Sequence, residues 1–431
     1  MNAAQVAQLQ RERLTSLLQH AHQHVPYYRE QLGSAGVVDD DGVHLERFNR
    51  VTPLDKDIIR SQFADLKADD VELESLRLNT SGGSTGQPVG FLQDATMHAW
   101  NTAVSMLFDE WAGTRPGDRR VVLWGAQRDL AAGRASIASR AGTWLRNELI
   151  FDAYLMTPEL MRRYVKQYNE FRPKHILAYA QSLYQWAVFI ESEGLSAHAP
   201  QSIITSATTL EPHMRLAIER VFKTRVINRY GSREVGGIAC EANDDDGLVV
   251  SALTHVVEVL GPDGEPAAAG ELGELVITLL TNRAMPLIRY RIGDAGILAA
   301  DATSKPFWPR LQEVAGRVTD IFYTANGDQV YGGYFTRMFY HRDWVAQFQV
   351  IQKDYEAIRV RIVPGRSLSA GAFEDEKREL TASIREAMGM SCLVEFEVVD
   401  SIAPGPSGKR RYTVSEVQPP SVSRAVGRTE S

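Results

Sequence analysis

The stretch of sequence best suited to chemistry is a run of glycines and hydroxyl residues at positions 80–88. It reads Thr80-Ser81-Gly82-Gly83-Ser84-Thr85-Gly86-Gln87-Pro88. Glycine lets backbone amides approach an anion closely, and the hydroxyls add donors, so the run could wrap a polyphosphate. It is not a Walker A motif, because no Lys-Ser or Lys-Thr pair follows the last glycine. A plain Gly/Ser surface loop is the alternative that this run alone leaves open.

Four further short motifs follow the glycine-rich run in a fixed order. Together with the run, they resemble the ordered motifs of the adenylate-forming superfamily of acyl- and aryl-coenzyme A ligases. Several matches in one order are far more specific than any single one. The four motifs are Tyr230-Gly231-Ser232-Arg233-Glu234, Tyr290-Arg291-Ile292-Gly293-Asp294, Gly316-Arg317 and Ser407-Gly408-Lys409.

Two other stretches carry a narrower likeness. Val25-Pro26-Tyr27-Tyr28 and Pro286-Leu287-Ile288-Arg289-Tyr290 resemble the phenylacetate-coenzyme A ligase branch and its capsule-biosynthesis relatives. The compact length of 431 residues agrees, and the likeness spans nearly the whole chain. These motifs specify adenylation chemistry well and the acid substrate poorly.

The resemblance implies a reaction in which a substrate carboxylate attacks the α-phosphate of ATP, giving an acyl-adenylate and pyrophosphate. Negative charge grows on the phosphate, so such a site needs donors, a divalent cation and a lysine. Glu234 is implied as a catalytic residue and Mg²⁺ ligand, because a hard cation prefers carboxylate oxygen; a solvated surface carboxylate is the alternative. Tyr230, Gly231 and Ser232 are implied as nucleotide-binding residues. The residues implied to hold the β- and γ-phosphates are Ser81, Gly82, Gly83, Ser84, Thr85 and Gly86.

Three further residues complete the implied site. Asp294 would accept hydrogen bonds from both ribose hydroxyls, because an ionised carboxylate has two oxygens and no donor. Arg317 would reach the ribose or the phosphate edge. Lys409 would be catalytic, bridging the substrate carboxylate and the α-phosphate. The alternatives are a turn aspartate, an exposed arginine and a solvated basic cluster of Lys409 with Arg410 and Arg411.

The resemblance also implies a second step, in which a small C-terminal domain rotates about a hinge near residues 317–320. Lys409 would swing out while the thiol of coenzyme A enters. The implied cofactors are ATP, Mg²⁺ and coenzyme A, and the implied substrate is an aromatic or hydrophobic carboxylic acid. Two alternatives stay open: an adenylating synthetase that passes the acyl group to an amine, another nucleophile or a carrier protein, and a degenerate member that only binds nucleotide or a partner protein.

Three positions depart from the family pattern. Arg233 stands where a Thr or Ser usually precedes the magnesium-binding Glu, Gln87 where a Lys often follows the glycine-rich run, and Thr319 where the hinge commonly has Asp. We expect adenylation to tolerate these departures better than thioester formation does.

The elements that must position these motifs show mixed periodicity. Helical spacing at 6–18 and 158–171 alternates with short apolar runs at 121–125, 175–178 and 202–205, which favours an α/β architecture. The region 248–280 is β-rich, with strands at 256–260 and 274–279 around the turn Pro262-Asp263-Gly264. Alternation at 358–362 and 394–398 brackets a charged helix at 373–388. The predicted fold is α/β: a large N-terminal domain (1–316) of mixed sheets and helices with a β-subdomain, plus a small mobile α+β C-terminal domain (317–431) that carries Lys409.

Composition narrows the class of protein and its partners. Hydrophobic residues make up 44% and charged residues 23%, which is typical of a globular chain. Forty-seven Lys and Arg against 54 Asp and Glu give a net charge of −7, so the chain lacks the positive field of a nucleic-acid binder. We find no secretory signal and no run of about 20 apolar residues, and predict a cytoplasmic protein without a membrane partner. A homodimer is one assembly that the sequence allows.

Two further groups of residues carry weaker signals. Cys240 and His255 could contribute to a zinc site of the kind seen in some relatives, but two ligands fall short of four, and a core cysteine and a strand-edge histidine fit better. Trp124, Tyr179 and Tyr184 could line a pocket for an aromatic acid, although aromatic side chains more often fill cores.

Overall fold

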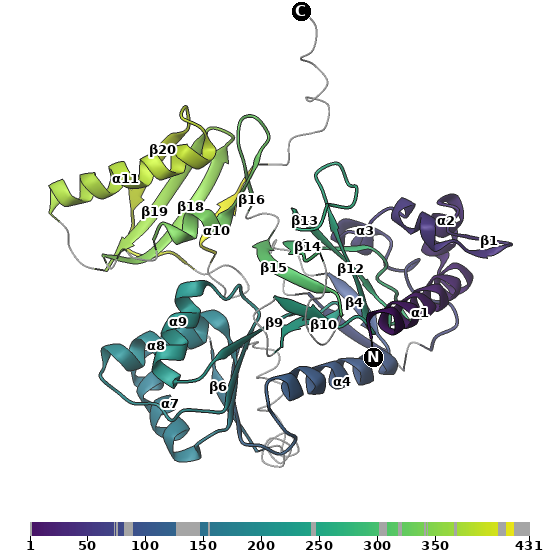
Figure 1. The fold of residues 1–431 in the computed structure, drawn as a ribbon, viewed down its shortest axis with the longest axis horizontal. Coiled ribbons are helices and arrows are strands. Elements are labelled where there is room, and N and C mark those ends of the chain that lie inside the picture. Colours follow the sequence, from purple (N-terminus) through teal and green to yellow (C-terminus); the bar gives the residue numbers. More distant parts are fainter. Residues whose placement is uncertain are drawn as a thin grey trace, which may run out of the picture.

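The structure is a computed structural model, and its described residues cover most of the chain (Figure 1). They are residues 2–72, 74, 76–81, 89–125, 147–153, 156–242, 247–300, 308–317, 321–339, 342, 344–365, 369–403 and 411–417. The helices are α1 (Ala3–His24), α2 (Pro26–Ser34), the 3-10 helix η1 (Leu45–Arg50), α3 (Lys56–Ser61), α4 (Ala95–Trp111), α7 (Pro158–Phe171), α8 (Ala180–Ser192), α9 (Pro212–Phe222), α10 (Gly332–Arg337) and α11 (Ala370–Met388).

The strands of the described residues group into five sheets. They are β1 (Val38–Asp39), β2 (Gly42–Val43), β3 (Arg77–Thr80), β4 (Gly90–Gln93), β5 (Arg120–Trp124), β6 (Glu148–Asp152), β7 (His175–Tyr179), β8 (Ser202–Ser206), β9 (Val226–Ser232), β10 (Gly236–Glu241), β11 (Leu248–Val250), β12 (His255–Leu260), β13 (Leu272–Leu279), β14 (Tyr290–Leu298), β15 (Arg310–Arg317), β16 (Ile321–Tyr323), β17 (Gln329–Tyr331), β18 (Val345–Asp354), β19 (Ala357–Pro364), β20 (Leu393–Val398) and β21 (Thr413–Ser415).

An 11-stranded sheet forms the centre of the molecule, in the order β12-β13-β14-β15-β11-β10-β9-β8-β7-β5-β6. Its parallel part, β6 to β9, is built from apolar runs such as 202–206, in which every residue is buried. Helices α7, α8 and α9 bury their apolar faces in one core with these strands. The α/β architecture is confirmed, and α7 has the bounds predicted from its periodicity.

The predicted β-rich region is present within the N-terminal domain. Strands β10 to β15 continue the parallel strands in one sheet. The junction is β9, which pairs parallel with β8 on one edge and antiparallel with β10 on the other. The short turn 233–235 joins β9 to β10 as a hairpin, so no interruption separates the two halves.

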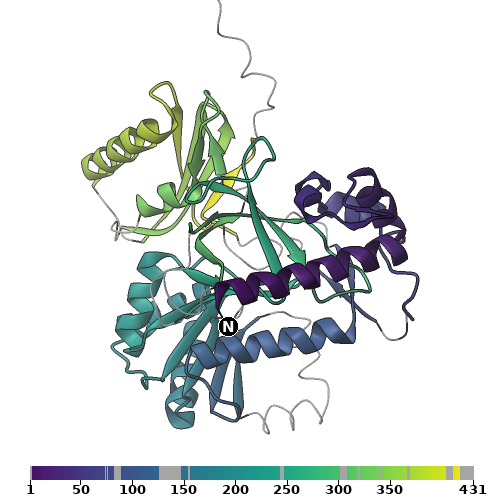
Figure 2. The ribbon, with the colours of Figure 1, turned by 45° about the vertical axis from the view of Figure 1, so that its right-hand side comes forward.

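The N-terminal segment packs on the antiparallel half of this sheet, and Figure 2 shows α1 lying across it. Gln10 Nε2 donates to the backbone oxygen of His255, and Arg13 Nη1 to that of Leu253, each over 2.7 Å. The buried Tyr28 hydroxyl donates to Pro286 O over 3.0 Å and accepts from Ile288 N over 3.1 Å. The two stretches that carried the narrower family likeness therefore contact each other directly.

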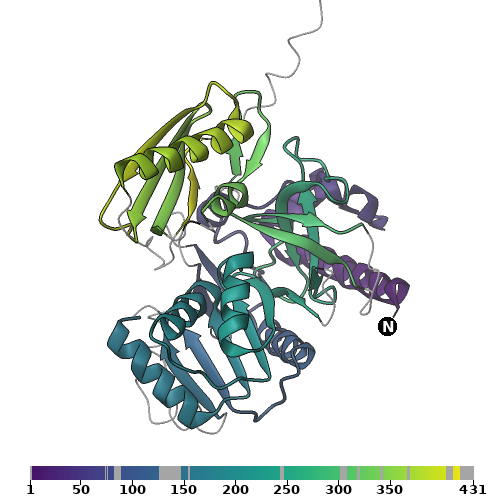
Figure 3. The same ribbon diagram turned by 60° about the vertical axis from the view of Figure 1, so that its left-hand side comes forward.

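The residues after β15 form a separate lobe, seen with α11 in front in Figure 3. Its four-stranded sheet has the order β20-β19-β18-β21, and α11 packs on it through buried residues such as Leu380 and Ile384. Helix α11 begins where Ser369 Oγ accepts from Ala372 N, and ends at Gly389, whose φ of 107° few other residues adopt. Among the described residues, no helix has the length and apolar character needed to cross a bilayer.

Candidate nucleotide and acid site

The glycine-rich run is closed at its base by two hydrogen bonds. Ser81 N donates to Val89 O over 2.9 Å, and Val89 N donates to Ser81 Oγ over 2.9 Å. These bonds extend the β3–β4 hairpin to the point where the run begins and ends. Ser81 is buried, and its hydroxyl retains a donor hydrogen. The predicted phosphate-binding residues Gly82, Gly83, Ser84, Thr85 and Gly86, and with them Gln87, lie outside the described residues.

Tyr230, Gly231 and Ser232 form the end of β9, directly before the turn that carries Glu234. A Cβ atom at Gly231 would lie 2.5 Å from Gly236 O on β10, closer than real Cβ contacts allow. Glycine is therefore required here because the two strands of the hairpin approach each other closely. Ser232 Oγ accepts from Val235 N over 3.3 Å and stabilises the turn.

The Glu234 side chain is largely buried, and the described residues offer its carboxylate no partner. Glu234 is 8% exposed, and in the described part of the chain no hydrogen-bond donor or cationic side chain contacts it. A carboxylate on a largely buried side chain, with no partner among the described residues, suits a cation supplied from outside the protein. Gln93 Nε2, at the end of β4, donates to Arg233 O over 3.0 Å. This bond ties the hairpin of the glycine-rich run to the turn of Glu234.

The predicted ribose ligand is joined to the β9 motif by a direct bond. Tyr230 OH donates to Asp294 Oδ2 over 2.7 Å, and Asp294 on β14 is the register partner of Arg317 on β15. Asp294 is thus a strand residue and not the turn residue of the alternative reading. Strands β9 and β14 stand four places apart in the sheet, roughly 19 Å if it were flat. The bond shows that the sheet curls, which brings motifs from three strands together.

Aromatic side chains gather at the carboxyl ends of the parallel strands. Trp124 ends β5, Tyr179 ends β7, and their ring centroids lie 4.3 Å apart. Tyr184 packs edge-on against His213 at 5.1 Å, and burial lowers the pKa of His213 to about 4. Ligands of parallel sheets bind beyond these strand ends. The aromatic residues considered from sequence therefore lie at the edge where a substrate acid would be expected.

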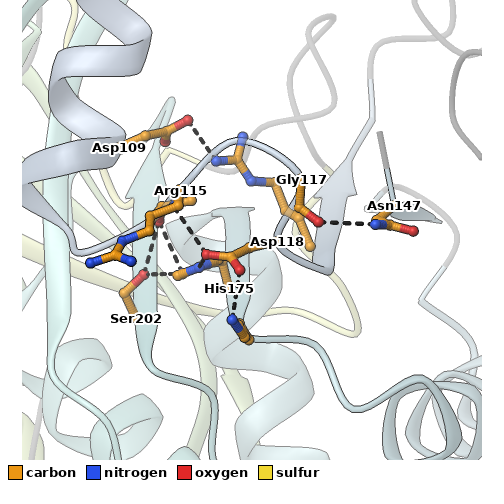
Figure 4. Close-up of polar contacts among 10 residues, drawn as sticks. Asp109, Arg115, Gly117, Asp118, Asn147, His175 and Ser202 are labelled. Carbon is orange, nitrogen blue, oxygen red and sulfur yellow. Dashed lines mark hydrogen bonds and ion pairs between the residues drawn. The ribbon is translucent and has the colours of Figure 1, made fainter. Parts of the chain in front are cut away.

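A second polar cluster lies at the opposite ends of these strands (Figure 4). Asp118 Oδ2 is 3.1 Å from His175 Nε2, and His175 Nδ1 is 2.7 Å from Ser202 Oγ and 2.9 Å from Thr114 Oγ1. The order of acid, imidazole and hydroxyl resembles a hydrolase triad. Ser202 is only 3% exposed, however, so its hydroxyl is out of reach of a substrate. Bonds from Lys174 and His175 hold the pKa of Asp118 far below its usual range, and burial lowers that of His175. We interpret the cluster, which the sequence did not suggest, as structural.

Among the described residues, Cys240 and His255 belong to no group of metal ligands. Both are buried; His255 Nε2 donates to Val235 O over 2.9 Å, and Nδ1 lies 2.8 Å from Thr254 Oγ1. Burial raises the pKa of the Cys240 thiol and lowers that of His255 to about 4. With both ring nitrogens engaged inside the protein, the core alternative describes this pair.

Two parts of the predicted site lie outside the described residues. They are Lys409 and positions 318–320 of the predicted hinge at 317–320, which include Thr319. For Arg317, the structure describes the backbone, which pairs with that of Asp294.

Comparisons with known proteins agree with the motif order. A family model described as the CapK C-terminal domain matches residues 322–416. The chain is 24% identical to the protein CapK of Staphylococcus aureus, across 95% of this chain and 89% of the other. It is 28% identical to the phenylacetate-coenzyme A ligase of Pseudomonas putida, across 73% of this chain and 71% of that enzyme.

A solved structure matches almost the whole fold. A 2-hydroxyisobutyryl-coenzyme A ligase in its postadenylation state superposes with a TM-score of 0.76 at 20% identity, covering 96% of this chain and 90% of that one. The same enzyme in its thioesterification state superposes with a TM-score of 0.60. The chain is thus similar in sequence to CapK and to phenylacetate-coenzyme A ligases, and it shares its fold with the 2-hydroxyisobutyryl-coenzyme A ligase.

Proposed function

We propose that the chain activates a carboxylic acid with ATP and transfers the acyl group to coenzyme A. The observation that carries the proposal is the bond between Tyr230 and Asp294, which joins two family motifs 64 positions apart. The bond from Gln93 to Arg233 adds the base of the glycine-rich run to the same neighbourhood. Motifs scattered along the sequence converge as a single nucleotide site requires.

In the first step, a carboxylate oxygen of the acid bonds to the α-phosphorus of ATP while the bond to the bridging oxygen of pyrophosphate breaks. Ser81 and the following residues 82–86 hold the β- and γ-phosphates. Asp294 accepts from the ribose hydroxyls, and Tyr230 orients it by occupying one lone pair of Oδ2. Glu234 would hold Mg²⁺, and the ion would supply positive charge to offset that of the phosphates.

In the second step, the thiol sulfur of coenzyme A bonds to the acyl carbon, AMP leaves and the thiol proton is released. We propose that the chain divides into domains 1–316 and 317–431, and that Lys409 serves adenylation before the C-terminal domain rotates. The higher TM-score to a postadenylation structure than to a thioesterification structure supports an arrangement that belongs to the first half-reaction.

The acid is aromatic or hydrophobic in this proposal. Support comes from the rings of Trp124, Tyr179 and Tyr184 at the carboxyl ends of the parallel strands, because aromatic faces favour an apolar ligand group. The phenylacetate-coenzyme A ligase of P. putida acts, by its name, on such an acid.

A second kind of molecule is a candidate acceptor of the acyl group. The likeness to the P. putida ligase covers 73% of the chain, whereas that to CapK covers 95%, and the CapK model matches the C-terminal lobe. An amine, another nucleophile or a carrier protein therefore remains the alternative acceptor.

The test is pyrophosphate release with ATP and Mg²⁺ across aryl, arylacetic and aliphatic acids, followed by mass spectrometry of products with and without coenzyme A. We expect pyrophosphate with at least one aromatic acid, and a coenzyme A thioester only when coenzyme A is present. An acylated amine, formed when an amine is supplied in place of coenzyme A, would identify the alternative acceptor. Nucleotide binding without pyrophosphate release for any acid would overturn the proposed enzyme.

A further inference from the structure

A group of metal-ligating side chains lies far along α1, outside the residues assigned to the nucleotide. His20 and His24 stand one helical turn apart on α1, and Asp70 follows the turn after α3. Their candidate ligand atoms all lie within 4.8 Å of one another. Asp70 Oδ2 is 3.9 Å from His20 Nδ1 and 3.8 Å from His24 Nδ1.

The tautomer of His20 can be inferred from its surroundings. His20 Nε2 lies 3.0 Å from Arg283 O, and a carbonyl oxygen only accepts, so Nε2 carries the ring proton. In the neutral ring, Nδ1 then presents a lone pair toward the carboxylate of Asp70. His20 is 8% exposed and the Asp70 side chain 40%, so the imidazole nitrogen is sheltered from water while the carboxylate stays open to an incoming ion. A cation placed between them would satisfy both.

The same arrangement is typical of metal-binding histidines. A ligating imidazole usually donates its second ring nitrogen to a carbonyl or carboxylate, which fixes the tautomer and the ring orientation. Arg283 O does this for His20. His24 Nδ1 lies 3.1 Å from Asp69 Oδ1. When a metal binds His24 Nδ1, Asp69 could either become the fourth ligand or give up its contact with that nitrogen.

Backbone bonds fix the three segments that supply these side chains. Asp69 N donates to His24 O over 2.8 Å, and Ala68 N donates to Ala284 O over 2.9 Å. The loop carrying Asp70 is thereby held against the end of α1 and against the segment that orients His20. Such support keeps ligand positions nearly constant before a metal arrives.

We propose that His20, His24 and Asp70 bind a divalent transition-metal ion, with Zn²⁺ as the ion of best fit. Two imidazole nitrogens and one carboxylate oxygen are a ligand set that Zn²⁺ accepts, with water or Asp69 completing a tetrahedron. Tetrahedral ligands about 2.0–2.1 Å from zinc are roughly 3.4 Å apart. The two histidine nitrogens lie 3.8–3.9 Å from Asp70 Oδ2, and all three ligand atoms lie within 4.8 Å of one another, so side-chain adjustment would bring them to this spacing. Mg²⁺ prefers oxygen ligands in an octahedron, so this site is chemically distinct from Glu234.

The bound ion would link α1, the loop at 68–70 and the segment at 283–284. Arg283 N donates to Asp94 Oδ2 over 2.8 Å, and Asp94 Oδ1 accepts from Met97 N at the start of α4. The site is therefore a structural clip between the N-terminal helix and the region that follows the glycine-rich hairpin.

The test uses the full chain, purified without a polyhistidine tag and stripped with a chelator. Calorimetric titration with Zn²⁺ should give one bound ion, and Co²⁺ should give the visible absorption of a tetrahedral site. His24→Ala and Asp70→Asn, both at accessible positions, should weaken Zn²⁺ binding at least about 10-fold. His22→Ala is the matched control, because His22 lies on the same last turn of α1 outside the cluster.

Thermal unfolding adds a second measurement, because an ion that binds only the folded chain raises Tm. Zn²⁺ should raise Tm of the wild type and of His22→Ala, and should raise it less in His24→Ala and Asp70→Asn. Pyrophosphate release with a carboxylic acid substrate should be the same in these two variants as in the wild type. The proposal is overturned if the wild type binds no Zn²⁺, or if His22→Ala weakens binding as much as His24→Ala. Failure of the ligase assay alone would not bear on it.

Discussion

The hydroxyl of Tyr230 donates a 2.7 Å hydrogen bond to Asp294 Oδ2, joining the end of β9 to the middle of β14. The two strands are not neighbours in the sheet, so the bond records how far the sheet curls. It also fixes one oxygen of the carboxylate proposed to bind the ribose.

Tyr230→Phe removes this bond and keeps the ring. A hydrogen bond to a charged group contributes about 1.5–3 kcal/mol, so KM for ATP should rise roughly 10-fold while kcat changes less. Steady-state pyrophosphate release at varied ATP checks this. Asp294→Asn should raise the same KM at least as much; wild-type values in both variants would contradict the ribose role.

Glu234→Gln tests the buried carboxylate. The amide keeps the shape of the side chain but loses its charge, so pyrophosphate release should fall about 100-fold and require more Mg²⁺. A magnesium titration of the rate gives both numbers. Glu110→Gln, at an exposed position on α4, is the control and should behave as wild type. An unchanged magnesium requirement in Glu234→Gln would remove Glu234 from the site.

Lys409→Ala should lower the rate of adenylation about 10²–10³-fold, because the ammonium would no longer neutralise charge at the α-phosphate. ATP binding, measured by calorimetry, should stay close to wild type. Lys353→Ala is the comparison, since Lys353 pairs with Glu416 elsewhere in the C-terminal lobe. If Lys409→Ala and Lys353→Ala lowered the rate of adenylation equally, the effect would come from a general change in the C-terminal lobe and not from Lys409 itself.

Much of the fold could be predicted from local pattern. Periodicity gave α7 at 158–171, and apolar runs gave β5, β7 and β8 to within a residue or so. The strands around the turn at 262–264 are β12 and β13, paired as a hairpin. These elements depend on contacts close in sequence, which a single sequence records.

The arrangement of the site could be predicted only through family resemblance. Nothing in the local pattern places β14 within reach of Tyr230, because that contact depends on strand order and on the curl of the sheet. The approach of His20 to Asp70 was missed for the same reason: the two residues lie on segments that meet only in the folded chain.

Tyr28→Phe should destabilise the protein by about 1–3 kcal/mol. The buried hydroxyl serves both Pro286 O and Ile288 N, and its removal leaves both without that partner. Denaturant unfolding measures the change. Tyr27→Phe is the matched control, because in the described structure the Tyr27 hydroxyl has no hydrogen bond; a similar loss there would contradict this account.

Acid should destabilise the fold through its buried histidines. Burial lowers the pKa of His255 to about 4, below the usual value of about 6.5, so the unfolded chain binds the proton first. The free energy of unfolding should therefore fall as pH drops from 6.5 to 4, by on the order of 3 kcal/mol for His255. Denaturant unfolding between pH 6.5 and 4 should show that the free energy of unfolding depends less steeply on pH in His255→Gln than in the wild type. His98→Gln, at an exposed position, should behave as the wild type. Equal slopes in all three would exclude His255 as a source of acid sensitivity.

The close approach of Gly231 to Gly236 O decides how position 231 can vary over evolution. Any side chain there would force the hairpin apart and displace both Tyr230 and Glu234, whatever acid the enzyme accepts. Glycine at this position will therefore persist in descendants whose substrates have diverged, and its persistence reports on backbone spacing and carries no information about specificity.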